Sequence, residues 1–191
     1  MRREEAESLI RDLDAGDRRA LARLGVRFGR HHLFVPQLLK PAASEARGRL
    51  LQIFHGRPLP LPPAGRTVVR FSMPTQGEDM LAVGFAAFTG FAVRVDILER
   101  LAARIRAHAR DSATFEVPPT LAAEAGLTRP ELASLVEALG FRPASAESGA
   151  AAFTRPASRR GERAAARRGS HTAPANSPFA VLAGLRLAPR G

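Results

Sequence analysis

Residues 57–65, RPLPLPPAG, hold four prolines in nine positions, and this segment limits the folds open to the chain. Proline lacks the backbone N–H that helices and sheets use, and its ring fixes φ, so neither a helix nor a central strand can pass through it. We expect an extended, polyproline-like connection at 57–65. It separates a helical N-terminal part from a small mixed segment of helices and strands.

The N-terminal part shows short helical patterns. Helices are predicted over residues 4–13 and 18–24, with Asp17 as the N-cap of the second. Residues 26–35 are strand-like or extended, and a long helical pattern then runs over residues 36–56.

After the prolines, a strand is predicted at 67–71, a helix at 79–88 and an extended piece at 91–95. The clearest helix runs over residues 97–108, where apolar side chains recur with helical spacing on one face and Asp96 stands at the N-cap position. We group residues 1–110 as one accessory region that includes the proline-rich connection.

Residues 111–156 predict a winged-helix-like unit, because a strand, a helix, a tight turn, a second helix and two further strands follow in order. Thr128 and Glu131 have the spacing of a capping box at the start of the second helix. That helix carries Glu131 and Glu137, and the segment has a net charge of −3, so phosphates would repel it. We expect a packing or protein-contact unit rather than a reader of bases.

The net charge of +11 favours polyanionic partners, and it lies at the ends of the chain, with +6 in residues 1–66 and +6 in residues 157–191. Residues 157–176 are predicted to be a disordered basic linker, and 177–191 a short docking helix begun by Ser177 and a proline. The fold class expected is α+β and mainly helical, with a helical N-terminal part, a small mixed segment, a winged-helix-like unit and a disordered basic tail.

Several classes of function lack their residues. The chain has no cysteine, and its only lysine, Lys40, has no phosphate-binding glycine loop before it. The five histidines show no i, i+4 pairing for a metal. We expect no catalytic residues, no metal and no membrane association, and we expect a cytoplasmic protein.

The segment LGVRFGRHHLFVPQLLKP, residues 24–41, carries the most specific polar cluster. A straight strand would leave neither side purely apolar, so a bend near Gly29 is expected. Such a bend would let Arg27 and Arg30 project together toward a phosphate. The alternative is that both arginines simply pair with acidic residues of the first helix.

Three blocks carry a family resemblance: LGVRFGRHHLFVPQLLKPAASEARGRLLQIFHG, AVRVDILERLA and SPFAVLAGL. Together they resemble the C-terminal region of superfamily 2 RNA helicases of the mitochondrial degradosome type, in particular the bacterial relatives. The two motor domains of that family, which bind ATP and Mg, have no counterpart here. By this resemblance the chain looks like a detached tail, which is a truncated helicase gene, a split subunit or a separately encoded remnant, without a cofactor of its own.

The resemblance implies a non-catalytic accessory module that binds single-stranded RNA or another nucleic acid and docks on a helicase motor or an RNA-degradation partner. The candidate nucleic-acid-binding residues are Arg27, Arg30, Lys40, Arg47, Arg49, Arg159, Arg160, Arg163, Arg167 and Arg168. The candidate docking residues are Phe179, Leu182 and Leu185. The alternatives are a stand-alone winged-helix DNA-binding regulator and a protein-interaction scaffold.

Overall fold

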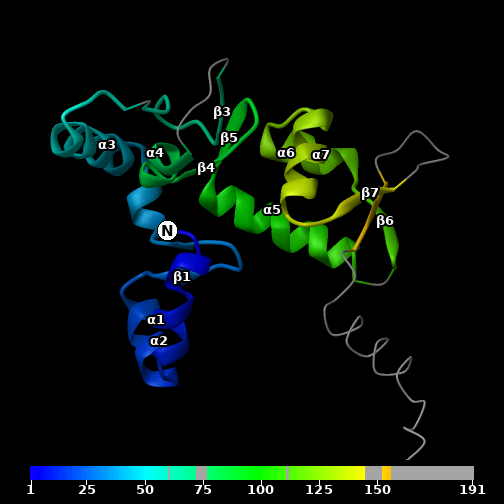
Figure 1. The fold of residues 1–191 in the computed structure, drawn as a ribbon, viewed down its shortest axis with the longest axis horizontal. Coiled ribbons are helices and arrows are strands. Elements are labelled where there is room, and N and C mark those ends of the chain that lie inside the picture. The colour runs from blue at the N-terminus through cyan, green and yellow to red at the C-terminus, as the bar shows by residue number, and fades with distance from the viewer. Residues whose placement is uncertain (60, 72–76, 111, 145–151, 156–191) are drawn as a thin grey trace, which may run out of the picture. The chain divides into compact units, whose positions relative to one another are not determined.

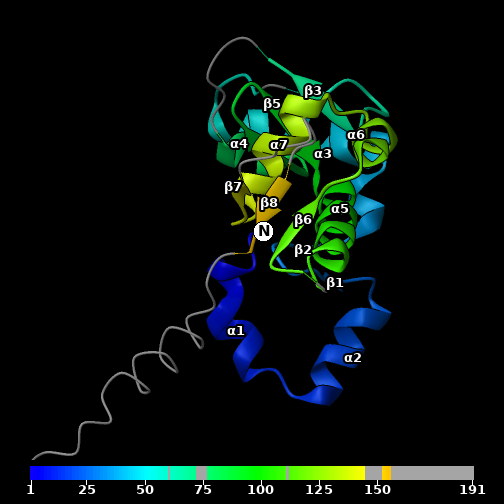
Figure 2. The same ribbon diagram turned by 90° about the vertical axis from the view of Figure 1, so that its right-hand side faces the viewer.

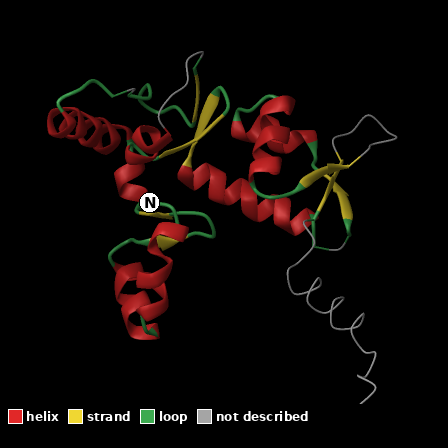
Figure 3. Cartoon of the chain, viewed as in Figure 1, coloured by secondary structure: helices red, strands yellow, loops and turns green. Residues whose placement is uncertain are grey.

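A computed structural model describes residues 1–59, 61–71, 77–110, 112–144 and 152–155. Within these residues the fold is α+β, as predicted, with seven α-helices, two short 3-10 helices and three small antiparallel sheets (Figures 1 and 3). Met1–Arg155 form one compact unit. The predicted disordered linker at 157–176 and docking helix at 177–191 lie outside the described residues.

The N-terminal helices are short. A 3-10 turn, η1 (Glu4–Ala6), leads into α1 (Glu7–Asp12), and α2 (Ala15–Arg23) forms the other arm of a U in Figure 2. The capping residue of α2 is Asp14 rather than the predicted Asp17. Asp17 instead occupies the N3 position and completes a capping box with Asp14, so the helix begins three residues earlier.

A hairpin follows, made of β1 (Arg27–Phe28) and β2 (Leu33–Phe34), which pair antiparallel. The chain therefore reverses between them, and the bend expected near Gly29 is confirmed. The start of the chain lies along β2, where the backbone N–H of Leu33 donates to the carbonyl of Met1 at 2.9 Å.

The long helical pattern over 36–56 divides into η2 (Pro36–Leu39) and α3 (Pro41–His55). A proline stands in the first turn of each, where its missing N–H costs nothing. Gly56 ends α3 in the left-handed conformation with φ 63°.

The helix predicted over residues 79–88 is wrong in its second half. The helix α4 (Gly77–Ala82) is short, and β4 (Phe85–Phe88) pairs with β5 (Phe91–Arg94). β3 (Val68–Arg70) pairs with the other edge of β5. The sequence Phe-Ala-Ala-Phe also suits a helix, but pairing with the fully buried Ala92 and Val93 of β5 decides for strand.

The largest core belongs to the second half of the chain. It is built by α5 (Val95–His108), β6 (Thr114–Glu116), α6 (Pro119–Ala125), α7 (Arg129–Ala138), β7 (Arg142–Ala144) and β8 (Ala152–Thr154). The three strands form a sheet in the order β6-β8-β7. Buried side chains from Phe91 to Phe153 make one continuous cluster, so the predicted boundary between residues 110 and 111 lies inside a hydrophobic core.

Two helix starts differ in their caps. The capping box predicted at Thr128 is present, because its hydroxyl accepts from Glu131 N and the Glu131 carboxylate accepts from Thr128 N. Asp96, expected to cap α5, instead binds the guanidinium of Arg94 at 2.7 Å. The residue at the cap position is Arg94, whose side chain makes no capping bond.

Candidate anion-binding site

The loop between β1 and β2 is held by one carboxylate from α5. Glu99 Oε2 accepts the backbone N–H of Arg30, and Oε1 accepts those of His31 and His32, each at 2.8 Å. His32, which is buried, adds a bond from Nδ1 to Glu99 Oε1 at 3.3 Å. Since a carboxylate only accepts, this ring nitrogen carries the hydrogen. We call this arrangement the Glu99 latch.

The latch keeps Glu99 charged. Burial acts to raise the pKa of this carboxyl group, but the hydrogen bond from His32 and the backbone bonds from His31, Arg30 and His32 outweigh it and lower the pKa to about 2. Both oxygens of this carboxylate accept hydrogen bonds from the loop, so Glu99 is not a bidentate partner for Arg30 or Arg106.

Gly29 is the residue that lets the loop approach α5 so closely. A Cβ at this position would stand 2.5 Å from the carboxyl carbon of Glu99 and 2.6 Å from the carbonyl oxygen of His32. The carbonyl of Gly29 also accepts from Arg3 Nη1 at 2.9 Å. The backbone here is thus fixed from both sides.

We predict that Gly29→Ala lowers the free energy of unfolding by about 1–3 kcal/mol, because the loop must move off Glu99 to admit the methyl group. Urea denaturation measures the change, and hydrogen exchange at residues 30–32 reports the loop. Gly77→Ala is the matched control, since its Cβ would meet only the Ala87 side chain at 3.9 Å. Equal stability and equal protection in both variants would contradict the role given to Gly29.

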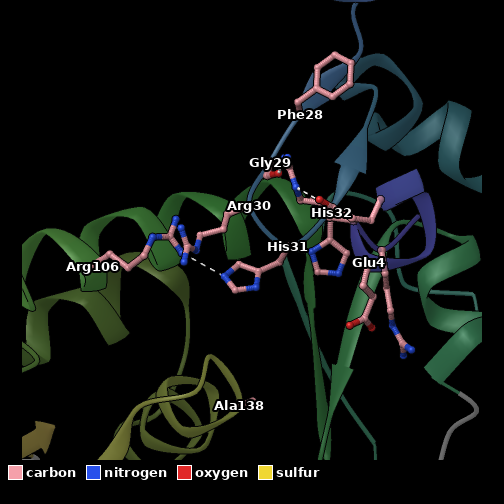
Figure 4. A pocket seen from close by; sticks show the side chains of 11 residues that line it. Glu4, Phe28, Gly29, Arg30, His31, His32, Arg106 and Ala138 are labelled. Atoms are coloured by element: carbon pink, nitrogen blue, oxygen red, sulfur yellow. Dashed lines mark hydrogen bonds and ion pairs between the residues drawn. The ribbon is translucent and has the colours of Figure 1, made fainter. Parts of the chain in front are cut away.

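Beside the Glu99 latch, the side chains of Arg30 and Arg106 lie close to one another (Figure 4). Arg106, from the last turns of α5, lies within 3.1 Å of His31 Nε2 through its Nη1. A guanidinium only donates, so Nε2 of His31 is the acceptor and the hydrogen is on Nδ1. Burial, followed by the nearby cations, lowers the pKa of His31 despite the opposing effect of Glu99, so the ring is neutral at pH 7.

Arg30 and Arg106 have no carboxylate as an ion-pair partner in the described part of the chain. Among the residues the structure describes, neither guanidinium takes part in an ion pair. Burial and the charge of Arg30 both lower the pKa of Arg106, against a partial compensation from Glu99. Two like charges are therefore held close together in a partly buried place, and an anion between them would relieve the repulsion.

These groups line an open pocket with a volume of about 930 Å³. Four arginines face it, Arg2, Arg3, Arg30 and Arg106, against the two carboxylates of Glu4 and Glu7. Arg3 lies 3.6 Å from Glu7, and Phe28 adds an aromatic ring to the lining. The pocket is accordingly positive and suited to an anion.

The structure separates the residues that the sequence grouped together. Arg30 lines the pocket, whereas Arg27 is exposed on β1 and does not belong to the lining, so the two do not share this site. Lys40 precedes α3, and Arg47 and Arg49 lie on it, exposed and outside the lining. Arg49 binds Glu45 one turn away at 2.6 Å.

The remaining predicted site residues lie outside the described residues. They are Arg159, Arg160, Arg163, Arg167, Arg168, Phe179, Leu182 and Leu185. The alternative was that Arg27 and Arg30 pair with acidic residues of the first helix. Among the described residues neither arginine forms an ion pair, and the arginine that pairs with α1 is Arg3, through Glu7.

Four important residues were missed from the sequence: Arg2, Arg3, Glu99 and Arg106. Glu99 and Arg106 are seven positions apart, which places them on one side of α5. That spacing shows that they share a helix face, but nothing in it indicates contact with a loop 67–69 residues earlier.

A second exposed feature is an apolar stripe on α3. Leu50, Ile53 and Phe54 are 67%, 79% and 82% exposed, and their spacing puts them on one face. No helix in the described part of the chain has the length and apolar character needed to cross a membrane. The same residues contain no group of three or more His, Asp or Glu side chains placed to hold a metal ion.

Comparison of the chain with protein-family models, with curated proteins and with solved structures finds no match.

Proposed function

We propose that this chain is a non-catalytic module that binds the phosphates of single-stranded RNA or another nucleic acid at the arginine-lined pocket. The observation that carries the proposal is the pair Arg30 and Arg106, which lie close together and form no ion pair with a carboxylate of the described residues. Guanidinium groups bind phosphate bidentately, and Phe28 offers a ring on which a base can stack without regard to sequence.

We further propose that the module is an accessory part of an RNA helicase of the mitochondrial degradosome type, acting with a motor supplied elsewhere. Two of the blocks that carry the resemblance meet in space, because the block at 24–56 contains the loop and the block at 92–102 contains Glu99. The resemblance thus includes the loop residues Phe28 to His32 of the lining and Glu99, while Arg106 lies four residues beyond the second block. Docking through Phe179, Leu182 and Leu185 stays a prediction.

The winged-helix interpretation is also kept as a proposal, with its start moved back to α5. The element order α5, β6, α6, α7, β7, β8 and the strand order β6-β8-β7 are typical of that architecture. The second helix, α7, contacts β4, and Arg70 of β3 binds the Glu131 carboxylate at 2.6 and 2.8 Å. Glu131 is thus paired, and the expected repulsion from phosphate rests on Glu137.

This packing favours the accessory module over the stand-alone DNA-binding regulator. Arg70 also donates to the carbonyl of Gly126, at the turn between α6 and α7. The β3-β5-β4 sheet therefore contacts the turn before α7, the helix that would read DNA in a winged-helix regulator. A helix held this way suits contact between parts of a protein better than entry into a major groove. The scaffold alternative gains support from the stripe on α3.

We predict that affinity for single-stranded RNA falls about 50-fold between 50 and 200 mM salt, the drop expected for about four phosphate contacts. Arg30→Ala with Arg106→Ala weakens binding about tenfold or more and reduces the salt slope. Fluorescence anisotropy with a labelled oligonucleotide measures both. The matched control is Arg100→Ala with Arg104→Ala, which removes the same charge from exposed positions of α5 outside the pocket lining.

If both double variants lost the same amount of affinity, the loss would reflect net charge alone and would contradict RNA binding at the pocket. Preference for duplex DNA, combined with loss of binding on Arg129→Ala in α7, would favour the regulator. Circular dichroism of each variant establishes that it is folded.

A further inference from the structure

The charged groups that line the pocket sum to +2, with the Glu99 carboxylate held by the loop backbone outside the lining, and one backbone phosphate neutralises only one of these charges. Four arginines stand against two glutamates in the lining, and His31 is neutral. A phosphodiester within a chain carries a single negative charge, whereas a phosphomonoester carries about −1.5 to −2 at pH 7. The monoester therefore matches the pocket better in charge.

The geometry also suits a group with three free oxygens. Arg30 and Arg106 approach from the loop and from α5, and each offers several N–H donors. A terminal phosphate has three free oxygens and can accept hydrogen bonds from both guanidinium groups at once. A phosphodiester has only two free oxygens, and the nucleic-acid chain continues from its other two. Arg106 Nη1 donates to His31 Nε2 at 3.1 Å, which orients the guanidinium and leaves its other N–H groups for the ligand.

We propose that the pocket binds a phosphomonoester, as found at the phosphorylated end of an RNA strand or in a free nucleotide, in preference to the phosphodiester backbone. This inference rests on the proposed function, since it names the phosphate group that the same site prefers. The Glu99 latch supports it, because both oxygens of this carboxylate accept backbone N–H groups of the loop and, among the described residues, Glu99 forms no ion pair with Arg30 or Arg106.

The test compares three RNA oligonucleotides of one sequence: with a 5′-phosphate, with a 3′-phosphate, and with hydroxyl groups at both ends. Titration by anisotropy at fixed salt is expected to give about tenfold tighter binding to one phosphorylated end than to the hydroxyl-ended strand. Arg30→Ala and Arg106→Ala each remove this difference. Arg104→Ala, on the same helix but outside the lining, keeps it.

Competition distinguishes the source of the monoester. AMP is expected to displace the phosphorylated oligonucleotide, and adenosine is not. If AMP competes at the concentration at which the phosphorylated strand binds, the ligand is the nucleotide monoester itself. If only the phosphorylated strand binds tightly, the ligand is an RNA end. Both results support the preference.

Equal affinity of all three oligonucleotides, with binding still lost in the Arg30 and Arg106 variants, would overturn the monoester preference and leave the proposed function standing. Absence of binding to any of them would overturn both. Arg30 is exposed on a loop, so its alanine variant remains folded even if the Arg106 variant does not.

Discussion

Leu135→Ala lowers the free energy of unfolding by about 2–5 kcal/mol, the loss expected when a large side chain is removed from a packed core. Leu135 lies on α7 with no exposed surface, in the cluster that joins α5, α6 and the β6-β8-β7 sheet. The cavity left by the truncation cannot collapse easily, because Val136 and Leu121 around the same cluster are also fully buried. Urea denaturation followed by circular dichroism measures the change.

Leu50→Ala is the control for this prediction. It makes the same chemical change at a side chain that is 67% exposed on α3, so the free energy of unfolding changes by about 0.5 kcal/mol or less. If Leu50→Ala destabilised the chain as much as Leu135→Ala does, the α3 stripe would be part of a core and not an exposed surface.

Glu99→Gln lowers the free energy of unfolding by about 2–3 kcal/mol at pH 7, because several hydrogen bonds to a charged acceptor are lost or weakened at once. An amide keeps the shape of the carboxylate, but its NH₂ group faces backbone N–H donors that need an acceptor. Glu137→Gln makes the same change at an exposed position of α7 and is expected to have little effect. Equal effects of the two variants would contradict the latch.

The pH dependence follows from the same residue. The pKa of Glu99 is about 2 in the folded chain against an ordinary value of 4.5, so its stabilisation is complete above pH 4.5 and is lost as the pH falls toward 2. A shift of this size corresponds to about 3 kcal/mol, and only 11% of the side chain is exposed. Glu131 contributes to the same loss of stability in acid, since the hydrogen bond from Arg70 lowers its pKa to about 2.

Urea unfolding of wild type and Glu99→Gln between pH 7 and pH 2.5 tests this. We expect the wild-type free energy to fall more steeply below pH 4.5, so that the two curves converge in acid. Parallel curves over the whole range would show that Glu99 titrates normally in the folded chain.

Local patterns predicted much of the secondary structure. The helix α5 and the box at Thr128 follow from apolar spacing and from capping chemistry, which act within a few residues. The whole of β4 falls within the helix expected over residues 79–88, because its two alanines and two phenylalanines carry no period that separates helix from strand. Pairing with β5 decided it, and pairing is invisible in a short window.

In the candidate site too, features set by neighbouring residues could be predicted, and contacts between distant segments could not. Arg30 was found because it lies in a conspicuous basic segment, and the bend at Gly29 followed from alternation. Arg106 and Glu99 come from the polar side of an ordinary amphipathic helix, where such residues usually face water. Only the folded chain shows that this side of α5 meets the loop, so the pocket could not be assembled from the sequence.

The distance along the chain between the two halves of the Glu99 latch has a consequence for synthesis in the cell. The hairpin leaves the ribosome 67–69 residues before its carboxylate partner does. At about 5–20 residues per second, the three backbone N–H groups of the loop wait roughly 3–14 s for Glu99. During that interval the loop N–H groups remain without the acceptor that the folded chain gives them, so the pocket forms only after α5 has been synthesised.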